Sequence, residues 1–426
     1  MTEIITEAKN SAKPKKAYVL TSGGLDSTLA VKMLQEQGIE VTGVYISTGF
    51  CINSHQKKAG RFDESKPDVF KVTEELGIDL EVIDISKEYL SIITNPVYGW
   101  GKNVNPCIDC RIHMLKKTRE LMETNGYDFI ATGEVLGQRP MSQRSDTSKL
   151  IAEKSGLNGL LLRPLSGQFH QITEPEKQGW VDRNKLGRIQ GRSRKEQFRL
   201  AKQYNLQNIS APAGGCCLLT DENYAVRFKD YLKDRKSLLN SDQSQPLTLN
   251  TLTALGTGRQ IKIRTGLKLI MGRNEGENKL LTHYAQNHIL LEPEFEKPGP
   301  TAILEFVYNE KNLDTQSEVS RLWKKETREA LSEAHHQIQE FLQKCGEPFY
   351  SNLTSEDLYI CASILARYAD CETDEKLKVH ISHHVNTNPI TQFELNVLPY
   401  SHEEILSKQL VFKGNEKHLN RATTLL

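Results

Sequence analysis

The sequence predicts an α/β protein, in which an N-terminal domain built on a parallel sheet precedes smaller α+β domains. Three observations favour this fold class. Short apolar runs alternate with stretches of helical periodicity in the first part of the chain, a glycine-rich hexapeptide joins the first run to the first helical stretch, and a strictly alternating segment follows later. With 38% hydrophobic and 26% charged residues, the 426-residue chain has the composition of a folded globular protein.

The N-terminal elements follow one another in strand–helix alternation. Residues 17–20 form an apolar run typical of a buried strand, and residues 27–37 have helical periodicity that ends before Gly38, a good helix cap. Residues 41–47 are rich in β-branched side chains and predict a second strand. The other expected elements are a helix near 67–76, a strand at 80–85, a helix at 111–124 and a strand at 129–132. Strands separated by helices predict a parallel sheet, which binds ligands at the carboxyl ends of its strands.

The pattern changes in the second half of the chain. Residues 140–204 are irregular and basic, and the polar stretch 241–246 predicts a linker. Residues 260–264 alternate apolar with polar or basic side chains and lead through a Thr-Gly turn into 267–271, which predicts a hairpin with one basic face. A long amphipathic helix is expected at 317–344.

Composition also excludes some classes of protein. No run of 18 apolar residues occurs, which excludes a membrane-spanning helix. The first sixteen residues precede an apolar stretch too short for a signal-peptide core, so we expect a disordered tail and a cytoplasmic protein. In that reducing compartment, metal-binding or catalytic roles are favoured over disulfides for the eight cysteines.

Positive charge is concentrated in two blocks, although 55 basic residues almost balance 54 acidic ones. Residues 178–205 contain eight basic and two acidic residues, and residues 259–274 contain five basic residues and no acidic one. Such blocks bind the phosphate backbone of a nucleic acid or form a solvated basic face. The candidate RNA contacts are Arg192, Arg194, Lys195, Lys262, Arg264 and Arg273.

The hexapeptide between the first strand and the first helix reads Ser22-Gly23-Gly24-Leu25-Asp26-Ser27. Its glycines allow the backbone to approach an anion closely, and the helix start supplies N–H donors at a positive dipole end. The serines add hydroxyl donors, while the carboxylate suits phosphates only if it holds a magnesium ion. This is not a Walker A loop, because no Gly-Lys-Ser/Thr follows. The alternative is a glycine turn that only caps the helix.

Four cysteines are placed in two short motifs. Cys107 and Cys110 form a Cys-x-x-Cys before the helix expected at 111–124, and Cys216 and Cys217 follow two glycines about a hundred residues later. Adjacent cysteines cannot easily supply two corners of one zinc tetrahedron. Three thiolates match a [4Fe–4S] cluster with one open iron. Buried, inert thiols are the alternative.

Together these motifs resemble a known family. The hexapeptide resembles the pyrophosphate-binding PP-loop of the adenine-nucleotide alpha hydrolase superfamily, and Thr132-Gly133 resembles its second nucleotide-contacting loop. With the cysteines, residues 17–232 resemble the tRNA thiouridine synthetases, in particular the iron–sulfur-dependent branch of the 2-thiouridine and 4-thiouridine enzymes. A second resemblance covers residues 250–310, where Gly272-Arg273-Asn274 is similar to the signature of an RNA-binding domain in ribosome quality-control proteins.

The first resemblance implies a Rossmann-like PP-loop ATPase that acts as a tRNA sulfurtransferase. ATP would adenylate a uridine carbonyl oxygen with release of pyrophosphate, and sulfur would then displace AMP. The implied catalytic residues are Asp26, Cys107, Cys110 and Cys216. The implied nucleotide contacts are Ser22, Gly23, Gly24, Asp26, Ser27, Thr132 and Gly133. The implied cofactors are Mg²⁺ at Asp26 and a [4Fe–4S] cluster on Cys107, Cys110 and Cys216, with Cys217 as the alternate ligand.

The expected parts of the chain follow these motifs. They are a disordered tail at 1–16, a PP-loop thiolation domain with a basic RNA-contacting extension at 17–240, a small basic β-rich RNA-binding domain at 246–310, and a helical or mixed region at 311–426. The expected partners are tRNA and a sulfur donor (free sulfide, a desulfurase or a sulfur carrier), with no membrane, and a homodimer is one option. Three alternatives stay open: a cysteine-persulfide sulfurtransferase without a cluster, a PP-loop amide ligase, and a non-catalytic RNA-binding quality-control factor.

Overall fold

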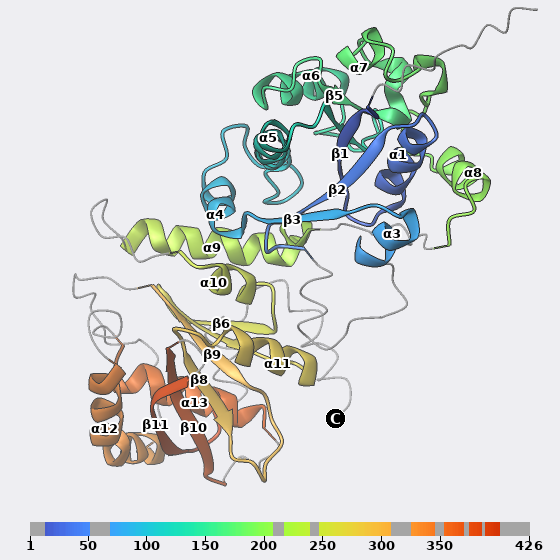
Figure 1. Ribbon diagram of the computed structural model, residues 1–426. Helices are drawn as coiled ribbons and strands as arrows, with labels where there is room; N and C mark the ends of the chain where they lie inside the picture. The colour runs from blue at the N-terminus through green and yellow to red at the C-terminus, as the bar shows by residue number, and fades with distance from the viewer. Residues whose placement is uncertain are drawn as a thin grey trace, which may run out of the picture. The chain divides into compact units, whose positions relative to one another are not determined.

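The computed structural model describes eight stretches of the chain and divides it into two compact units (Figure 1). The described residues are 13–51, 69–207, 217–238, 247–307, 325–345, 353–369, 375–385 and 388–400. Unit 1 comprises Met1–Thr48 and Asp63–Gly214, and unit 2 comprises Gly49–Phe62 and Gly215–Leu426. Most of the expected tail, the linker at 241–246, the start of the helix expected at 317–344, and Cys216 lie outside the described residues. The four parts expected from the sequence, with their roles, stay predictions, because two compact units do not reveal what each part does.

Unit 1 is built on a five-stranded sheet whose neighbouring strands are all parallel, in the order β3-β2-β1-β4-β5. The strands are β1 (Lys16–Leu20), β2 (Glu40–Ser47), β3 (Leu80–Asp84), β4 (Phe129–Thr132) and β5 (Leu161–Leu162). The predicted fold class is therefore confirmed. The order places β1 between β2 and β4, because β2 and β3 are added on one side of β1, and β4 and β5 on the other. At such a switch point, a ligand crevice forms outside the carboxyl ends of the two neighbouring strands.

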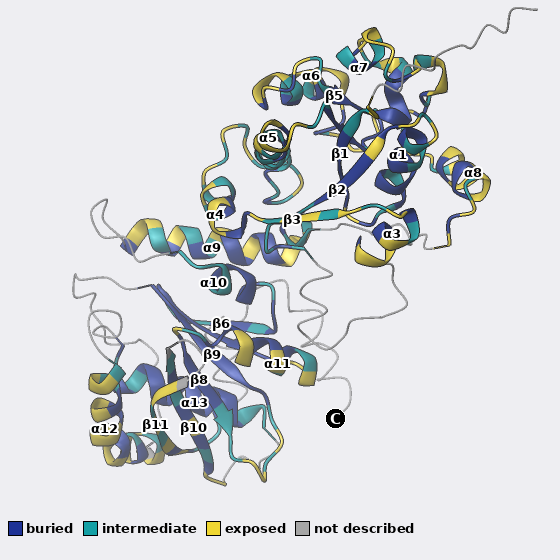
Figure 2. Cartoon of the chain, in the orientation of Figure 1, coloured by how far each residue is buried: buried dark blue, intermediate teal, exposed yellow. Residues whose placement is uncertain are grey.

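Helices cover both faces of this sheet, with α1 and α8 on one side and α5 and α6 on the other (Figure 1). The helices are α1 (Leu25–Gln35), α3 (Val69–Leu76), α4 (Ser86–Thr94), α5 (Cys107–Asn125), α6 (Ser145–Lys154), α7 (Glu174–Lys177) and α8 (Lys195–Gln203). One hydrophobic core lies between the sheet and the first group of helices, where the apolar residues of β1 pack against α1 and α8. Most of β1 and α1 is coloured as buried in Figure 2. Burial of this apolar surface stabilises the unit.

Two expected helices begin earlier than the sequence indicates, and α1, expected at 27–37, spans Leu25–Gln35. The helix expected at 111–124 starts at Cys107, so the Cys-x-x-Cys lies in its first turn and not before it. Pro106 at the N-cap explains the difference, because proline lacks an amide hydrogen and is tolerated where the helix leaves its amides unpaired. The two thiols therefore project from a helix start.

Unit 2 contains a six-stranded antiparallel sheet in the order β11-β10-β8-β9-β7-β6. Its strands are β6 (Arg259–Arg264), β7 (Leu267–Met271), β8 (Ile289–Pro293), β9 (Ala302–Phe306), β10 (Leu377–Val385) and β11 (Asn388–Val397). Its helices are α9 (Glu222–Leu238), α10 (Leu249–Ala254), α11 (Glu275–Tyr284), α12 (Lys325–Cys345) and α13 (Ser355–Arg367). The predicted hairpin is confirmed as β6–β7. Strands from both sides of residue 310 share this sheet and one hydrophobic core with α12 and α13. Among the described helices, none combines the length and apolarity needed to cross a membrane.

Candidate functional site

The glycine-rich hexapeptide lies at the carboxyl end of β1, where α1 begins. Gly23 has a φ of 72°, a left-handed conformation that favours glycine, and Gly24 is the N-cap of α1. The loop is fixed by its own hydrogen bonds, since the Ser27 hydroxyl donates to the Gly24 carbonyl at 2.8 Å and the Thr28 amide donates to the same oxygen at 3.1 Å. Thr21, which sequence reasoning missed, donates its hydroxyl hydrogen to Ser27 Oγ at 3.3 Å.

The second predicted nucleotide loop lies directly against the first. Thr132 ends β4, the strand next to β1, and Gly133 follows it. A Cβ atom at Gly133 would collide with the backbone of Asp26 and Ser27. Glycine is therefore required for the two loops to meet backbone to backbone. The structure thus brings together the predicted nucleotide residues on both loops.

Asp26 has one satisfied and one unsatisfied carboxylate oxygen. Gln138 Nε2 donates a hydrogen bond to Asp26 Oδ2 at 2.8 Å. Asp26 Oδ1 is buried and accepts no hydrogen bond from the described residues, and the nearest cation is Arg194, with Nη2 at 3.9 Å. A buried polar atom without a partner needs a ligand, an ion or a water. A hard carboxylate oxygen of this kind fits Mg²⁺.

Glu134, which sequence reasoning left without a role, lies buried next to this junction. Arg163 Nε and Arg111 Nε each lie 3.0 Å from one of its carboxylate oxygens. Burial raises the pKa of Glu134, but the guanidinium groups of Arg111 and Arg163 outweigh burial, and the pKa is lowered. Since Arg111 follows Cys110 on α5, Glu134 fixes the cysteine-bearing helix to the end of β4. An isolated acidic residue after a strand gives no signal for this role in the sequence.

Removing the charge of Glu134 is expected to destabilise the protein strongly. Glu134→Gln should lower the free energy of unfolding by about 3–5 kcal/mol, because it leaves the buried Arg163 guanidinium without its counterion. Since the pKa of Glu134 is lowered in the fold, its stabilisation is present above the unfolded pKa and is lost as pH falls through the folded pKa. Urea unfolding at neutral and acidic pH measures both effects.

Glu88→Gln is the matched control, because Glu88 pairs with Lys117 but is half-exposed. Solvent screens that pair, so its loss should change stability far less. Equal effects of the two substitutions would show that Glu134 has no structural role.

Cys107 and Cys110 are both half-buried in the first turn of α5. Burial raises the pKa of the Cys107 thiol, although the guanidinium groups of Arg111 and Arg139 act in the opposite direction. Cys110 Sγ lies 3.7 Å from Met114 Sδ on the next turn. Among the described residues, no three His, Cys, Asp or Glu side chains gather in a way that could hold a metal ion. Two of the thiols expected for a cluster, those of Cys107 and Cys110, therefore lie in one helical turn.

Cys217, the alternate third ligand, is described within unit 2. It forms an isolated antiparallel bridge with Cys51, and the Leu218 amide donates to the Phe50 carbonyl at 3.0 Å. Cys216 lies outside the described residues. The expected ligand set of Cys107, Cys110 and Cys216 stays a prediction.

Both nucleotide loops and the Cys-x-x-Cys lie in a segment that is similar to known proteins. Residues 15–153 match the family model described as tRNA methyl transferase HUP domain. The tRNA-specific 2-thiouridylase MnmA of Petrotoga mobilis is 31% identical over 131 residues, which cover 29% of this chain and 36% of the relative. The enzyme of the same name from Campylobacter concisus is 36% identical over 122 residues, which cover 28% of this chain and 34% of the relative.

The N-terminal unit is similar to the PP-loop tRNA thiouridylases. The chain spans about a third of the length of these curated relatives. Among solved structures, a 4-thiouridine synthetase–RNA complex with bound ATP is 20% identical, covers 44% of this chain and 50% of that chain, and has a TM-score of 0.28. Residues 258–339 match a second family model, described as NFACT protein RNA binding domain.

The predicted RNA contacts of this thiouridylase-like unit differ in exposure. Arg192 and Lys195, beside the start of α8, are exposed. Arg194 is turned inward toward Asp26 and is only 21% exposed. The exposed pair suits a phosphate backbone, whereas Arg194 faces the PP-loop.

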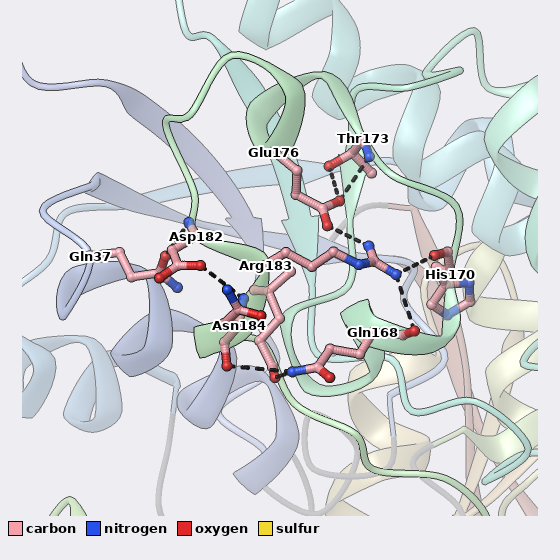
Figure 3. Close-up of polar contacts among 9 residues, drawn as sticks. Gln37, Gln168, His170, Thr173, Glu176, Asp182, Arg183 and Asn184 are labelled. Atoms are coloured by element: carbon pink, nitrogen blue, oxygen red, sulfur yellow. Dashed lines mark hydrogen bonds and ion pairs between the residues drawn. The ribbon is translucent and has the colours of Figure 1, made fainter.

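Part of the first basic block is used inside the thiouridylase-like unit itself (Figure 3). Arg183 forms an ion pair with Glu176 and donates to the carbonyl oxygens of Gln168 at 3.1 Å and His170 at 3.0 Å. Glu176 also accepts the amide of Thr173 at 2.8 Å, which completes a capping box on α7. The number of basic residues in this block therefore overstates the charge available to RNA.

The three basic residues of unit 2 that are predicted to contact RNA each form an ion pair with a carboxylate. Lys262 lies 3.0 Å from Asp230 and 2.8 Å from Asp234 of α9. Arg264 lies 2.8 Å from Asp357 of α13, and Arg273 pairs with Glu277 at 2.5 Å. An RNA phosphate would have to compete with these carboxylates, so the predicted contacts of Lys262, Arg264 and Arg273 stay predictions.

Proposed function

We propose that the chain is an ATP-dependent tRNA sulfurtransferase that replaces a uridine carbonyl oxygen with sulfur to give 2-thiouridine or 4-thiouridine. The observation that carries this proposal is the junction of the PP-loop with Thr132-Gly133 at the switch point of the sheet, where one oxygen of Asp26 has no hydrogen-bond partner among the described residues. The similarity of the same residues to tRNA-specific 2-thiouridylases supports tRNA as the substrate and sulfur as the group transferred. We place the reaction in the cytoplasm.

The first step is activation of the uridine by ATP. Gly23, Gly24 and the hydroxyls of Ser22 and Ser27 would bind the pyrophosphate, since amides at a helix start favour anions. The uridine oxygen attacks the α-phosphate and pyrophosphate leaves. Mg²⁺ held by Asp26 would neutralise charge on the phosphates. The oxygen, now bonded to AMP, has become a good leaving group.

The second step is attack by sulfur on the activated carbon, with departure of AMP. Cys107 and Cys110 project from the start of α5, which Arg111 and Glu134 fix to the end of β4. Cys107, Cys110 and Cys216, or Cys217 in its place, would hold the proposed [4Fe–4S] cluster, whose chemistry would be to supply the sulfide. A persulfide on the same cysteines is the alternative route. A brown anaerobic preparation with broad absorption favours the cluster.

Binding of tRNA would use the exposed Arg192 and Lys195 and the region similar to the NFACT RNA-binding domain. Such contacts position the RNA, while the uridine must leave the stack to reach the PP-loop. The sulfur donor is free sulfide, a desulfurase or a sulfur carrier.

Mass spectrometry of nucleosides from the tRNA of a deletion strain tests this function. We expect one thionucleoside to disappear and to return when the unaltered gene is supplied, because the proposed enzyme introduces its sulfur. Complementation with an Asp26→Asn variant should not restore it. An unchanged set of thionucleosides in the deletion strain would refute the proposed function and favour an amide ligase or a non-catalytic RNA-binding factor.

A further inference from the structure

We propose that Arg194 binds the phosphate chain of the nucleotide, and that Gln138 and Gln197 are positioning residues that orient Asp26 toward the same phosphates. This rests on the proposed use of ATP and changes the role expected for Arg194, which the sequence places among the RNA contacts. The candidate ligand is a nucleoside triphosphate, recognised at its phosphates.

Arg194 and Asp26 face each other without forming a close ion pair. Their nearest atoms, Arg194 Nη2 and Asp26 Oδ1, are 3.9 Å apart, which is too long for a hydrogen bond. Arg194 Nε and Asp26 Oδ1 are both buried and have no hydrogen-bond partner among the described residues. The two side chains carry opposite charges, and each has a buried polar atom without a hydrogen-bond partner among the described residues, so a ligand could satisfy both, directly or through a cation.

A chain of amides holds the carboxylate in place. Gln197, in the first turn of α8, is fully buried, and its Nε2 donates to Gln138 Oε1 at 3.3 Å. Gln138 Nε2 then donates to Asp26 Oδ2 at 2.8 Å. Gln197 Oε1 is buried and unpaired among the described residues. Buried polar atoms usually have a hydrogen-bond partner. Gln197 Oε1, Asp26 Oδ1 and Arg194 Nε have none among the described residues, which indicates a ligand site and not only a packing contact.

The chemistry of the site favours a phosphate. A guanidinium presents its donors in a planar fork that matches phosphate oxygens, and Arg194 is held beside the Phe198 ring with the guanidinium carbon 5.6 Å from the ring centroid. The carboxylate of Asp26 would repel phosphates unless positive charge lies nearby. Arg194 supplies that charge at the end of the PP-loop, whereas its neighbour Arg192 is exposed.

Isothermal titration of the full chain with α,β-methylene-ATP and with adenosine tests this role. Arg194→Gln should weaken binding of the ATP analogue by roughly 10- to 100-fold, the loss typical of hydrogen bonds to a charged group. Adenosine, which lacks phosphates, should bind equally to the variant and the unaltered protein. Arg199→Gln, a matched loss of an exposed guanidinium on the same helix, should change neither.

The outcomes separate this inference from the proposed function. If the unaltered protein does not bind the ATP analogue, the proposed function fails. If it binds and Arg194→Gln binds equally well, or loses affinity for adenosine by the same factor, the inference alone is wrong. Thermal unfolding without nucleotide checks that the variant is folded. If Arg194→Gln is not folded, Arg194→Lys is measured instead, since it keeps the positive charge but loses the planar guanidinium. The affinity of Arg194→Lys for the ATP analogue should fall, and its adenosine binding should be retained.

Discussion

Asp26→Asn is expected to reduce adenylation of tRNA by about 100-fold or more, while tRNA binding stays close to that of the unaltered protein. Asparagine keeps the size of the side chain and an oxygen for the hydrogen bond from Gln138. It loses the negative charge that would hold Mg²⁺ at Oδ1, the oxygen without a partner in the described part of the chain. Pyrophosphate release in the presence of tRNA and ATP measures the effect.

Asp146→Asn provides the control, because Asp146 is an exposed acidic residue of the same unit, in the first turn of α6. It should release pyrophosphate at the normal rate. If Asp26→Asn also released pyrophosphate at the normal rate, the carboxylate would have no role at the phosphates, and the hexapeptide would be only a turn that caps α1.

Alanine at Cys107, Cys110 or Cys216 is expected to abolish thiolation. If these residues hold a cluster, each substitution should also remove bound iron, since a cluster with an open iron already has its minimum of three protein ligands. Cys217 is the internal control, because adjacent side chains point in different directions and only one of the pair should matter. Thionucleoside yield and iron content, measured on the same anaerobic preparation, show which cysteines thiolation requires and which cysteines iron binding requires.

Cys345→Ala is the matched control for a cysteine that serves only packing. Cys345 is half-buried like Cys107 and packs beside the core of unit 2, and burial raises the pKa of its thiol to about 12. It should keep full activity and full iron content, as should Cys51→Ala. Full thiolation by protein without detectable iron would rule out the cluster and leave the persulfide route.

The sequence predicts most of the N-terminal sheet because β1, β2 and β4 are apolar runs with clear helical stretches between them. It misses β5, since Leu161–Leu162 is too short to show a period, and it misses α4 at Ser86–Thr94. It also places the start of α5 too late, because Cys107 and Cys110 are interpreted as a Cys-x-x-Cys motif before the helix and not as its first turn.

The nucleotide loops were predictable because their residues are close together in the sequence. The partners of Asp26 were not, since Gln138 lies 112 residues away and is brought there by the fold. The inward direction of Arg194 and the pairing of Glu134 with Arg163 also depend on tertiary contacts. In the hairpin, the alternation predicted the strands correctly but could not reveal that carboxylates from α9 and α13 pair with Lys262 and Arg264.

The strand order of unit 2 bears on how the chain folds during translation. β8 lies between β9, which follows it closely, and β10, which is synthesised roughly 80 residues later. At a ribosomal rate of about 5–20 residues per second, the edge of β8 that pairs with β10 stays unpaired for several seconds. An exposed strand edge invites pairing with other chains. The nascent protein therefore passes through an aggregation-prone interval, and a transcript truncated before β10 would yield a product that keeps this exposed edge.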